Sequence, residues 1–461
     1  MRPRSLRSML SLAFLALAAI TAPACGPGGD ANNPSRTPLA DKWLARAQNS
    51  YRQGDFEDAQ HAGKAALEVA PRDHDIRLIN ARISLARLEY AQALKLTEGM
   101  QSTDAHAIRG RAFWYSGDLE QAADALEAAL RDPAVKDPWA REIAALARRG
   151  TGRHPFQMEG GLVAPVDMPP AGPALVVPCE LEGERILAMI ATGSGEVIID
   201  SNSRREAAWV NMKFGDRIEV KDIPALTQDL SGLSRQLGAP VKALLGVNLL
   251  RHLHVTFDRR GDQFVVRRSD PPAPPEASRV PLWYVRGGGM MMRATVSPRE
   301  DGGATLLVDS SQPFLLALND SVWKKSGFDM RNLRTDPSIP NLKTGVLPQF
   351  RIGGFDLPGV PAVQGASMEP LQQNIDVELG GVMGAGLVSA FRITLGDEGR
   401  FAWLEPDPAL SGPTGRDAGG PPSTPPPGAA PAPEGLTMPA PPAPPPPSKP
   451  TPAKPAPEPK K

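Results

Sequence analysis

The sequence is poor in cysteine, in aromatic residues and in net charge. Its 461 residues include two cysteines and four tyrosines, and 5% of them are aromatic. Lys and Arg together number 51, as do Asp and Glu, so the formal net charge is zero. A nucleic-acid-binding protein usually carries a basic excess on one face. We therefore expect no nucleic acid among the partners of this chain.

A long apolar run is missing as well. The segment SMLSLAFLALAAI, residues 8–20, is apolar but too short to span a bilayer as a mature helix. It follows the basic segment MRPRSLR, and this order of charge and apolarity is typical of an export signal. We predict a signal peptide over residues 1–24 and a tether over 25–38.

The end of this leader, TAPAC, allows two cleavage sites. Ala22-Pro23-Ala24 fits an ordinary small-residue site, whereas Ala24-Cys25 resembles the lipobox of bacterial lipoproteins, with Ala22 where leucine is usual. The resemblance implies lipidation at Cys25, membrane contact through that N-terminal lipid, and an outer-membrane lipoprotein facing the periplasm or the surface. Cys179 then has no disulfide partner, and we expect it to be a small buried hydrophobe.

Residues 39–150 are rich in alanine, with apolar residues at helical spacing. The clearest unit carries Trp43, Ala47, Gly54, Phe56, Ala59, Ala66, Leu67 and Pro71. A second good copy carries Gly110, Gly117, Leu119, Ala122, Ala129 and Leu130, and a weaker one between them has Ala81, Tyr90 and Ala93. The spacing resembles that of tetratricopeptide repeats, which implies an all-α solenoid of helix pairs with a peptide-binding concave face. We expect its small residues to allow close helix approach and its large ones to fill the space between units.

After Gly150 the sequence changes to short apolar runs separated by Gly and Pro, which predicts strands. Two halves, residues 151–270 and 280–405, are joined by a linker at 271–279 and repeat the same parts in the same order. ILAMIATGSG at 186–195 matches ATLLVDSSQP at 304–313, and ALLGVNLLRHLHVTF at 243–257 matches GVMGAGLVSAFRITL at 381–395. Between these, Ile223–Leu226 matches Val360–Val363, with an insertion of about twenty residues in the second half.

This duplicated order, an apolar strand, an Asp-Thr-Gly-type turn, a hairpin and an apolar-apolar-Gly element, resembles that of retropepsin-like and pepsin-like aspartic proteases. The resemblance implies an all-β, two-lobed domain with one catalytic Asp in each lobe. Such enzymes share one proton between two carboxylates, so that one acts as base and the other as acid. Here the first turn is Ala191-Thr192-Gly193-Ser194 and the second is Asp309-Ser310-Ser311. We expect these seven residues to line a peptide-binding cleft in which Asp309 is a vestigial catalytic residue facing Ala191.

Loss of one carboxylate predicts loss of useful peptidase activity, because acid and base partners each contribute about 10²- to 10⁴-fold. Ser311 in place of glycine further predicts a disturbed floor where the two turns should pack together. Glu196 or Asp200 could replace Ala191 only through a rebuilt loop. Alternatively, two copies could pair their Asp309 residues, although the tethered first lobe competes with such a dimer.

Other sites are weaker. His252 and His254 alternate on a predicted strand and could bind a metal, but the corresponding residues of the second half are Ala390 and Arg392 and no third ligand lies near. Gly287-Gly288-Gly289 lacks the context of a phosphate-binding loop and is expected to turn a hairpin. Met290–Met292 are expected to fill a strand. We predict neither metal nor cofactor.

Residues 406–461 are dominated by proline, alanine and glycine. Such a composition cannot bury enough apolar surface to fold, so we predict a disordered tail with polyproline II character.

The sequence is compatible with three functions. The first is a cell-envelope lipoprotein that binds peptides or proteins through its helical repeats and a catalytically degenerate cleft. The second is an active aspartic peptidase with an altered dyad that uses Asp309. The third is a non-enzymatic envelope scaffold.

Overall fold

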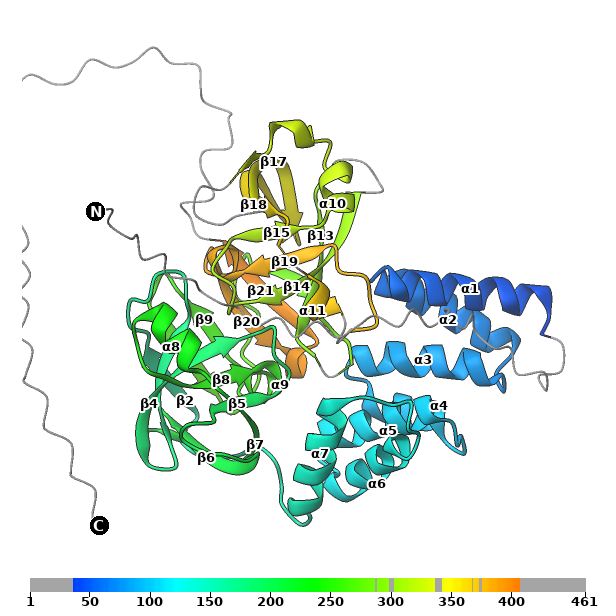
Figure 1. Ribbon diagram of the computed structural model, residues 1–461, viewed down its shortest axis with the longest axis horizontal. Helices are drawn as coiled ribbons and strands as arrows, with labels where there is room; N and C mark the ends of the chain where they lie inside the picture. Colours follow the sequence, from blue (N-terminus) through cyan, green and yellow to red (C-terminus); the bar gives the residue numbers. More distant parts are fainter. Residues whose placement is uncertain are drawn as a thin grey trace, which may run out of the picture. The chain divides into compact units, whose positions relative to one another are not determined.

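The computed structural model describes residues 36–286, 288–297, 302–335, 342–366, 368–372 and 375–406. They form an N-terminal helical region followed by a β-rich region (Figure 1). The predicted signal peptide, Cys25, nearly all of the tether and the proline-rich tail beyond Pro406 lie outside the described residues. Within these described ranges, no helix is long and apolar enough to cross a membrane.

The helical region runs through α1 (Pro38–Arg52), α2 (Phe56–Val69), α3 (His74–Ala86), α4 (Tyr90–Thr97), α5 (Thr103–Ser116), α6 (Leu119–Leu130) and α7 (Pro138–Arg149). Side chains that accept hydrogen bonds from first-turn N–H groups start most of them: Asp55 caps α2, Asp118 caps α6 and Asp137 caps α7. Gly117 ends α5 with a left-handed φ of 84°.

Small residues let these helices approach closely, as the sequence predicts. A Cβ on Gly110 in α5 would lie 2.5 Å from the Leu126 side chain in α6. Phe56 packs edge-on against Tyr51 of α1, with ring centroids 5.7 Å apart, and also reaches beyond the helices. Its ring stacks on Trp283 of the β-rich region, with centroids 4.5 Å apart.

The first lobe of the β-rich region contains β3 (Val176–Leu181), β4 (Glu184–Ala191), β5 (Val197–Asp200), β6 (Ala208–Phe214), β7 (Ile218–Gln228), α8 (Ser231–Leu237), β8 (Val241–Gly246) and α9 (Val247–His252), with β1 (Gln157–Gly160) beside β7. The second lobe contains β12 (Trp283–Tyr284), β13 (Met290–Thr295), β14 (Gly303–Asp309), β15 (Leu316–Leu318), α10 (Asp320–Lys325), η2 (Met330–Asn332), β16 (Arg334–Thr335), β17 (Lys343–Ile352), β18 (Phe355–Gln364), α11 (Glu369–Gln372), β19 (Gly381–Gly384) and α12 (Ala385–Val388).

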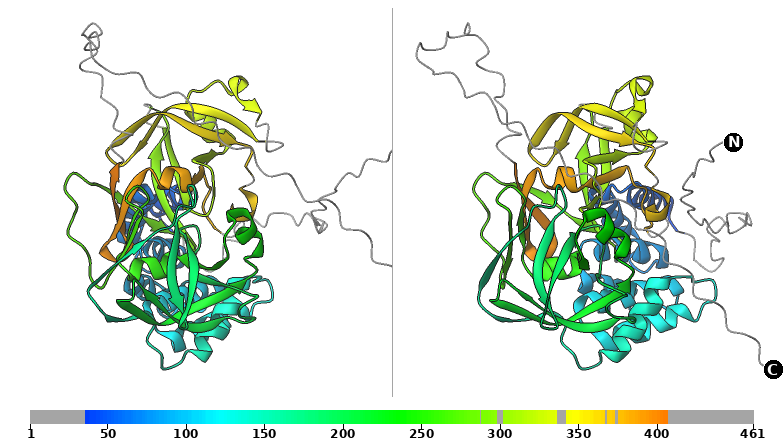
Figure 2. Two further views of the ribbon diagram at one scale, coloured as in Figure 1. Left: turned by 90° about the vertical axis from the view of Figure 1, so that its left-hand side faces the viewer. Right: turned by 60° about the vertical axis from the view of Figure 1, so that its left-hand side comes forward.

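The two lobes have the same topology. Neighbouring strands follow the order β7-β5-β8-β4-β3 in the first lobe and β18-β15-β19-β14-β13 in the second. The pairs β4 and β8, and β14 and β19, are parallel. All three sequence matches therefore fall on equivalent elements. The insertion in the second lobe corresponds to α10, η2 and β16, which lie between β15 and β17. Figure 2 shows the yellow strands of the second lobe above the green strands of the first.

A third sheet joins the lobes. Its order is β11 (Ser278–Pro281), β21 (Phe401–Pro406), β20 (Phe391–Gly396), β9 (Thr256–Asp258), β10 (Gln263–Arg267) and β2 (Val163–Asp167). The central pair β9 and β20 matches Thr256 with Thr394, whose hydroxyl oxygens lie 2.8 Å apart. Equivalent strands from both lobes thus meet at the centre of this sheet, which gives the β-rich region an approximate twofold symmetry. The turn η3 (Asp397–Gly399) joins β20 to β21.

Three predicted boundaries shift where strands or helices extend further. Residues 278–279 of the predicted linker belong to β11, which pairs with β21. Pro406, predicted to start the tail, pairs with Phe391 at the end of β21. Pro38, predicted to end the tether, begins α1 with Thr37 as its cap. In the first two cases pairing with a distant strand orders a segment whose own composition favours a loop, and in the third Thr37 caps the helix locally.

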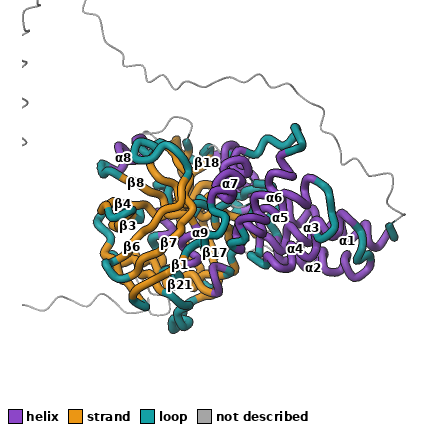
Figure 3. The backbone as a smooth tube through the Cα atoms, turned by 90° about the horizontal axis from the view of Figure 1, so that it is seen from below, coloured by secondary structure: helices purple, strands orange, loops and turns teal. Residues whose placement is uncertain are grey.

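The helical region contacts both lobes, and Figure 3 shows its purple helices gathered on one side of the orange strands. On the first lobe, the Trp209 indole N–H donates to the Leu146 carbonyl of α7 at 3.2 Å. On the second lobe, the Thr305 hydroxyl donates to the Gly54 carbonyl at 2.9 Å, and the Glu378 N–H donates to the Arg52 carbonyl at 2.7 Å.

Candidate functional site

Two turns at the ends of equivalent strands form the candidate site. The first turn, residues 191–194, follows β4, and the second turn, residues 309–312, follows β14. Ala191 pairs with Gly246 of β8, and Asp309 pairs with Gly384 of β19 in the same parallel arrangement. Ala191 and Asp309 therefore hold equivalent positions, as the sequence match predicts.

The turns hold each other through reciprocal hydrogen bonds. The Thr192 hydroxyl donates to the Val308 carbonyl, and the Ser310 hydroxyl donates to the Ile190 carbonyl, each at 2.7 Å. In return, the Ser310 N–H donates to the Thr192 hydroxyl at 3.0 Å and the Thr192 N–H donates to the Ser310 hydroxyl at 3.1 Å. Both side chains are buried, so these bonds are shielded from water. Thr192 and Ser310 form the floor of the site.

Asp309 accepts hydrogen bonds from its own turn. Its Oδ1 accepts from the Ser311 N–H at 3.0 Å and from the Ser311 hydroxyl at 2.6 Å, and its Oδ2 accepts from the Gln312 amide at 3.1 Å. Asp309 is 5% exposed. The carboxylate is therefore held in one orientation beside the first turn.

The expectation that Ser311 disturbs the floor is wrong. Its N–H and hydroxyl both bind the Asp309 carboxylate, so the extra side chain is used within the second turn. Glycine remains necessary in the first turn, because a Cβ on Gly193 would lie 2.4 Å from the Asp309 carboxyl carbon. The two turns thus pack closely with glycine on one side only.

Ser194 completes the first turn through hydrogen bonds to residues of the first lobe. Its N–H donates to the Ala191 carbonyl at 3.0 Å, and its hydroxyl donates to the Glu196 carbonyl at 3.0 Å. Its own carbonyl accepts from the Val247 N–H at the start of α9, at 2.9 Å. Ser194 therefore fixes the path from the turn into β5.

The two acids that follow the first turn, Glu196 and Asp200, are both bound to other groups. Ala191 is 2% exposed. The Asp200 carboxylate is 3.0 Å from the Lys242 ammonium and accepts a hydrogen bond from the Asn202 amide at 3.0 Å. Although burial opposes the effect, these bonds lower the pKa of Asp200. The Glu196 carboxylate is bound by the helical region, so both acids are held by other partners.

Glu196 connects the first turn to the helical region. Its Oε1 accepts hydrogen bonds from the indole N–H of Trp114 in α5 at 3.2 Å and of Trp139 in α7 at 3.3 Å. Burial raises its pKa to about 6, against the opposing hydrogen bonds from both indoles and Asn248 and the charge of Arg251. Sequence reasoning missed this role, since its signal lies in two tryptophans of a different region.

A pocket of about 260 Å³ lies beside the second turn. Ser310, Ser311 and Gln312 form one side of it, and Met189, Leu233 and Leu237 supply apolar groups. On the other turn, the Met290 N–H donates to the Thr192 carbonyl at 2.8 Å. A Cβ on Gly289 would lie 2.5 Å from the Gly193 carbonyl oxygen, so the chain before β13 lies directly on the first turn.

The two histidines considered as metal ligands are not on a strand. His252 ends α9 and His254 lies in the following turn with φ of 43°. The His252 ring stacks on Phe156 at 4.4 Å, and its burial lowers its pKa well below the usual value. His254 Nδ1 is 2.8 Å from Asp270 Oδ1. Among the described residues, no group of three or more His, Cys, Asp or Glu residues could hold a metal ion.

Other expected features are found in the second lobe and in β3. Met290–Met292 are buried in β13, as predicted. β12 and β13 pair as an antiparallel hairpin around Gly288 and Gly289, while Gly287 lies outside the described residues. Cys179 is buried in β3, and this burial raises the pKa of its thiol to about 12. A thiol that stays protonated is a small hydrophobe rather than a nucleophile, as expected.

No protein-family model and no curated protein sequence matches the chain. Three solved structures are distantly similar. The tetratricopeptide domain of Arabidopsis OM64 has 15% identity and a TM-score of 0.23, covering 25% of this chain and 98% of that one. A retropepsin-like aspartic protease from Rickettsia conorii has 17% identity and a TM-score of 0.22, and the match covers 29% of this chain and 94% of the protease. Basic 7S globulin from soybean has 10% identity and a TM-score of 0.36, and the match covers 54% of this chain and 95% of the globulin.

Proposed function

We propose that this chain binds an extended peptide between its two β-lobes without cleaving it. The observation that supports this proposal is that the position equivalent to Asp309 in the first lobe is occupied by Ala191, which has no carboxylate. The turns remain hydrogen-bonded to each other through Thr192 and Ser310, while only one carboxylate, Asp309, is kept. An extended chain binds such a cleft mainly through main-chain hydrogen bonds, which need no catalytic acid.

Proteolysis by this route requires a base for the water and an acid for the carbonyl. Asp309 alone supplies one group, and the nearby acids Glu196 and Asp200 are bound to Trp114, Trp139 and Lys242. Removal of one acid or base partner typically costs about 10²- to 10⁴-fold in rate. We therefore propose a degenerate site rather than an altered peptidase.

The pocket beside the second turn supports a preference among peptides. Leu233 and Leu237 of α8 and Met189 of β4 line it, so an apolar side chain of the bound peptide fits there. We also propose that α1–α7 are tetratricopeptide-like helix pairs and add a protein-binding surface. The leader sequence supports export and lipidation at Cys25, which would place this binding activity in the cell envelope.

The test is cleavage and capture of a pooled peptide library by the purified chain, compared with Ala191→Asp and Asp309→Asn. We expect the wild type to retain peptides without cutting them, and Ala191→Asp to gain acid-pH cleavage, because it restores the second carboxylate on an intact floor. Cleavage by the wild type that disappears in Asp309→Asn would establish a peptidase instead. Leu237→Asp serves as the capture control, since it places a charge in the apolar pocket and should abolish retention.

A further inference from the structure

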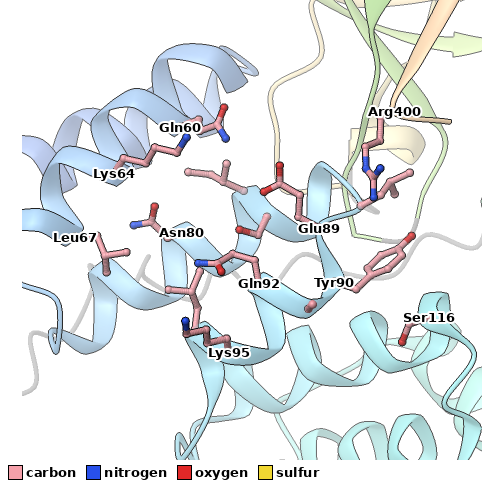
Figure 4. A pocket seen from close by; sticks show the side chains of 15 residues that line it. Gln60, Lys64, Leu67, Asn80, Glu89, Tyr90, Gln92, Lys95, Ser116 and Arg400 are labelled. Carbon is pink, nitrogen blue, oxygen red and sulfur yellow. The ribbon is translucent and has the colours of Figure 1, made fainter. Parts of the chain in front are cut away.

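A groove separate from the cleft lies where the helical region meets the β-rich region. Its larger part is a pocket of about 820 Å³ between α2, α3 and α4, which Figure 4 shows with Gln60 and Lys64 on one wall and Glu89 and Tyr90 on the other. Arg400, between η3 and β21, closes one end. A volume of this size is typical of pockets that enclose a ligand, about 300–1,000 Å³.

A second pocket, of about 260 Å³, continues the groove past Arg400. It is lined by Arg87 from the helical region and by Arg279, Trp283 and Phe401 from the β-rich region. The two pockets share Arg400, so both regions build one continuous surface. We call this surface, with Lys64 and Lys95 at one end and Arg279 at the other, the junction groove.

The charges of the junction groove are not balanced. Glu89 is paired with Arg87 at 2.8 Å, and Arg400 is paired with Asp397 at 2.9 Å. By contrast, Lys64 and Lys95 form no ion pair with any residue in the described part of the chain.

Arg279, at the other end of the groove, forms no ion pair within the same described ranges, and its guanidinium lies 4.0 Å from the Phe401 ring centroid. Glu57 is the one lining acid without an ion pair among the described residues. The groove therefore presents an excess of exposed positive charge on a chain whose net charge is zero.

The floor between these cations is apolar. Leu67, Ile83, Leu88 and Leu96 contribute to the larger pocket. A ligand that fits needs apolar side chains for the floor and negative charges for the two ends. A nucleic acid fits poorly, because its charged backbone would have to lie over this apolar floor, which a peptide can cover with apolar side chains.

From this arrangement we infer that the junction groove binds an acidic, leucine-containing segment of a partner protein. Lys64 and Lys95 contact its carboxylates at one end and Arg279 does so at the other, while its apolar side chains rest on the leucine-rich floor. This site does not depend on peptide capture between the lobes, because the groove shares no lining residue with the two turns.

The probe is a short fluorescent peptide of Glu, Leu and Ser, titrated against the full chain. We expect Lys64→Glu with Lys95→Glu to weaken its binding by about tenfold or more, and Arg279→Glu by about threefold or more, with binding also falling as salt is added. Lys136→Glu, an exposed lysine between α6 and α7, is the matched control and should bind within about twofold of the wild type. All four lysine and arginine side chains are exposed, so the variants should melt like the wild type.

Three results would overturn the inference. Equal binding of the same peptide with Lys in place of Glu would remove the charge selectivity. An unchanged affinity in Arg279→Glu would confine the site to the helices and exclude a junction groove. Competition by a single-stranded oligonucleotide at equal concentration would indicate a general polyanion surface. Failure here leaves the cleavage result of Ala191→Asp and the capture result of Leu237→Asp unaffected, so the two proposals are separable.

Discussion

Glu196 carries its carboxyl group between two indoles that come from different helices. Trp114 and Trp139 donate to the same oxygen, and Glu196 is 4% exposed. Burial penalises the charged carboxylate more than these donors favour it, so the pKa of Glu196 rises from 4.5 to about 6. The residue thus couples the packing of the helical region on the first lobe to pH.

The sign of this coupling follows from the raised pKa. The protonated carboxyl is favoured in the folded chain, so its contribution is fully present below pH 4.5 and is lost as pH rises through about 6. A shift from 4.5 to about 6 corresponds to roughly 2 kcal/mol. We predict that Glu196→Gln, which stays neutral, removes this part of the pH dependence. The measurement is the free energy of unfolding by urea for wild type and variant between pH 4 and 7.

Glu184→Gln is the matched control, because Glu184 is exposed at the start of β4. Its stability profile should run parallel to that of the wild type. A wild-type minus Glu196→Gln difference that stays constant across this pH range would contradict the prediction.

At the scale of single residues, the sequence predicts the position of a residue within a local motif, but not the hydrogen bonds that the residue forms with distant parts of the chain. Ala191 and Asp309 could be matched because each ends an apolar strand and is followed by a hydroxyl residue, Thr192 or Ser310. The role of Glu196 could not be predicted, because its donors lie in the helical region. The role of Ser311 was mispredicted, because a side chain expected to obstruct the turn instead binds Asp309.

At the scale of elements, the floor of the site depends on strands that pass closely behind the two turns. β8 reaches the first turn at Gly246, where a Cβ would lie 2.1 Å from the Glu196 carbonyl oxygen. β19 passes behind the second turn at Gly384, where a Cβ would lie 2.1 Å from the Phe314 carbonyl oxygen. Glycine is required at both crossings because the obstacle is backbone rather than a movable side chain.

We predict that Gly246→Ala destabilises the chain by about 1–3 kcal/mol or more, because the added methyl group must displace the backbone at Glu196. Gly232→Ala in α8 is the control, since its nearest neighbour is 4.0 Å away on the flexible Arg235 side chain. There alanine favours the helix and should stabilise the chain by up to about 1 kcal/mol. Thermal unfolding of both variants is the measurement. Equal unfolding midpoints would contradict the claim that β8 requires glycine at position 246.

Elements were predictable where the two lobes repeat each other. The matches placed β4 with β14, β7 with β18 and β8 with β19, because equivalent packing keeps the same apolar pattern. His252 and His254 were misassigned because a short apolar run with alternating polar residues is compatible with strand or helix. α9 forms there because Gly246 ends β8 and the Val247 and Asn248 N–H groups donate to the carbonyls of Ser194 and Gly195.

At the scale of the described molecule, the helical region is bound to both lobes. α1 and α2 contact the second lobe through Arg52, Gly54 and Phe56, and α7 contacts the first lobe through Leu146. The sequence predicted separate helical and β-rich regions, but not these contacts, since an aromatic residue in a repeat looks the same whether it packs on a helix or on a strand. Such contacts make the helices part of the support of the candidate site.

Phe56, which is 2% exposed and stacks on Trp283, lies in the contact with the second lobe. Phe56→Ala should cost about 3–5 kcal/mol, because it leaves a cavity between α2 and β12. Since β12 pairs with β13 and β13 with β14, the loosening should reach the strand that ends at Asp309. We therefore expect faster amide hydrogen exchange in peptides covering β12–β14 as well as α1 and α2. Leu39→Ala is the control: the Leu39 side chain is 52% exposed, so this variant should exchange like the wild type. Faster exchange in the helices alone would show that the helical region packs on the second lobe without stabilising β14, the strand that ends at Asp309.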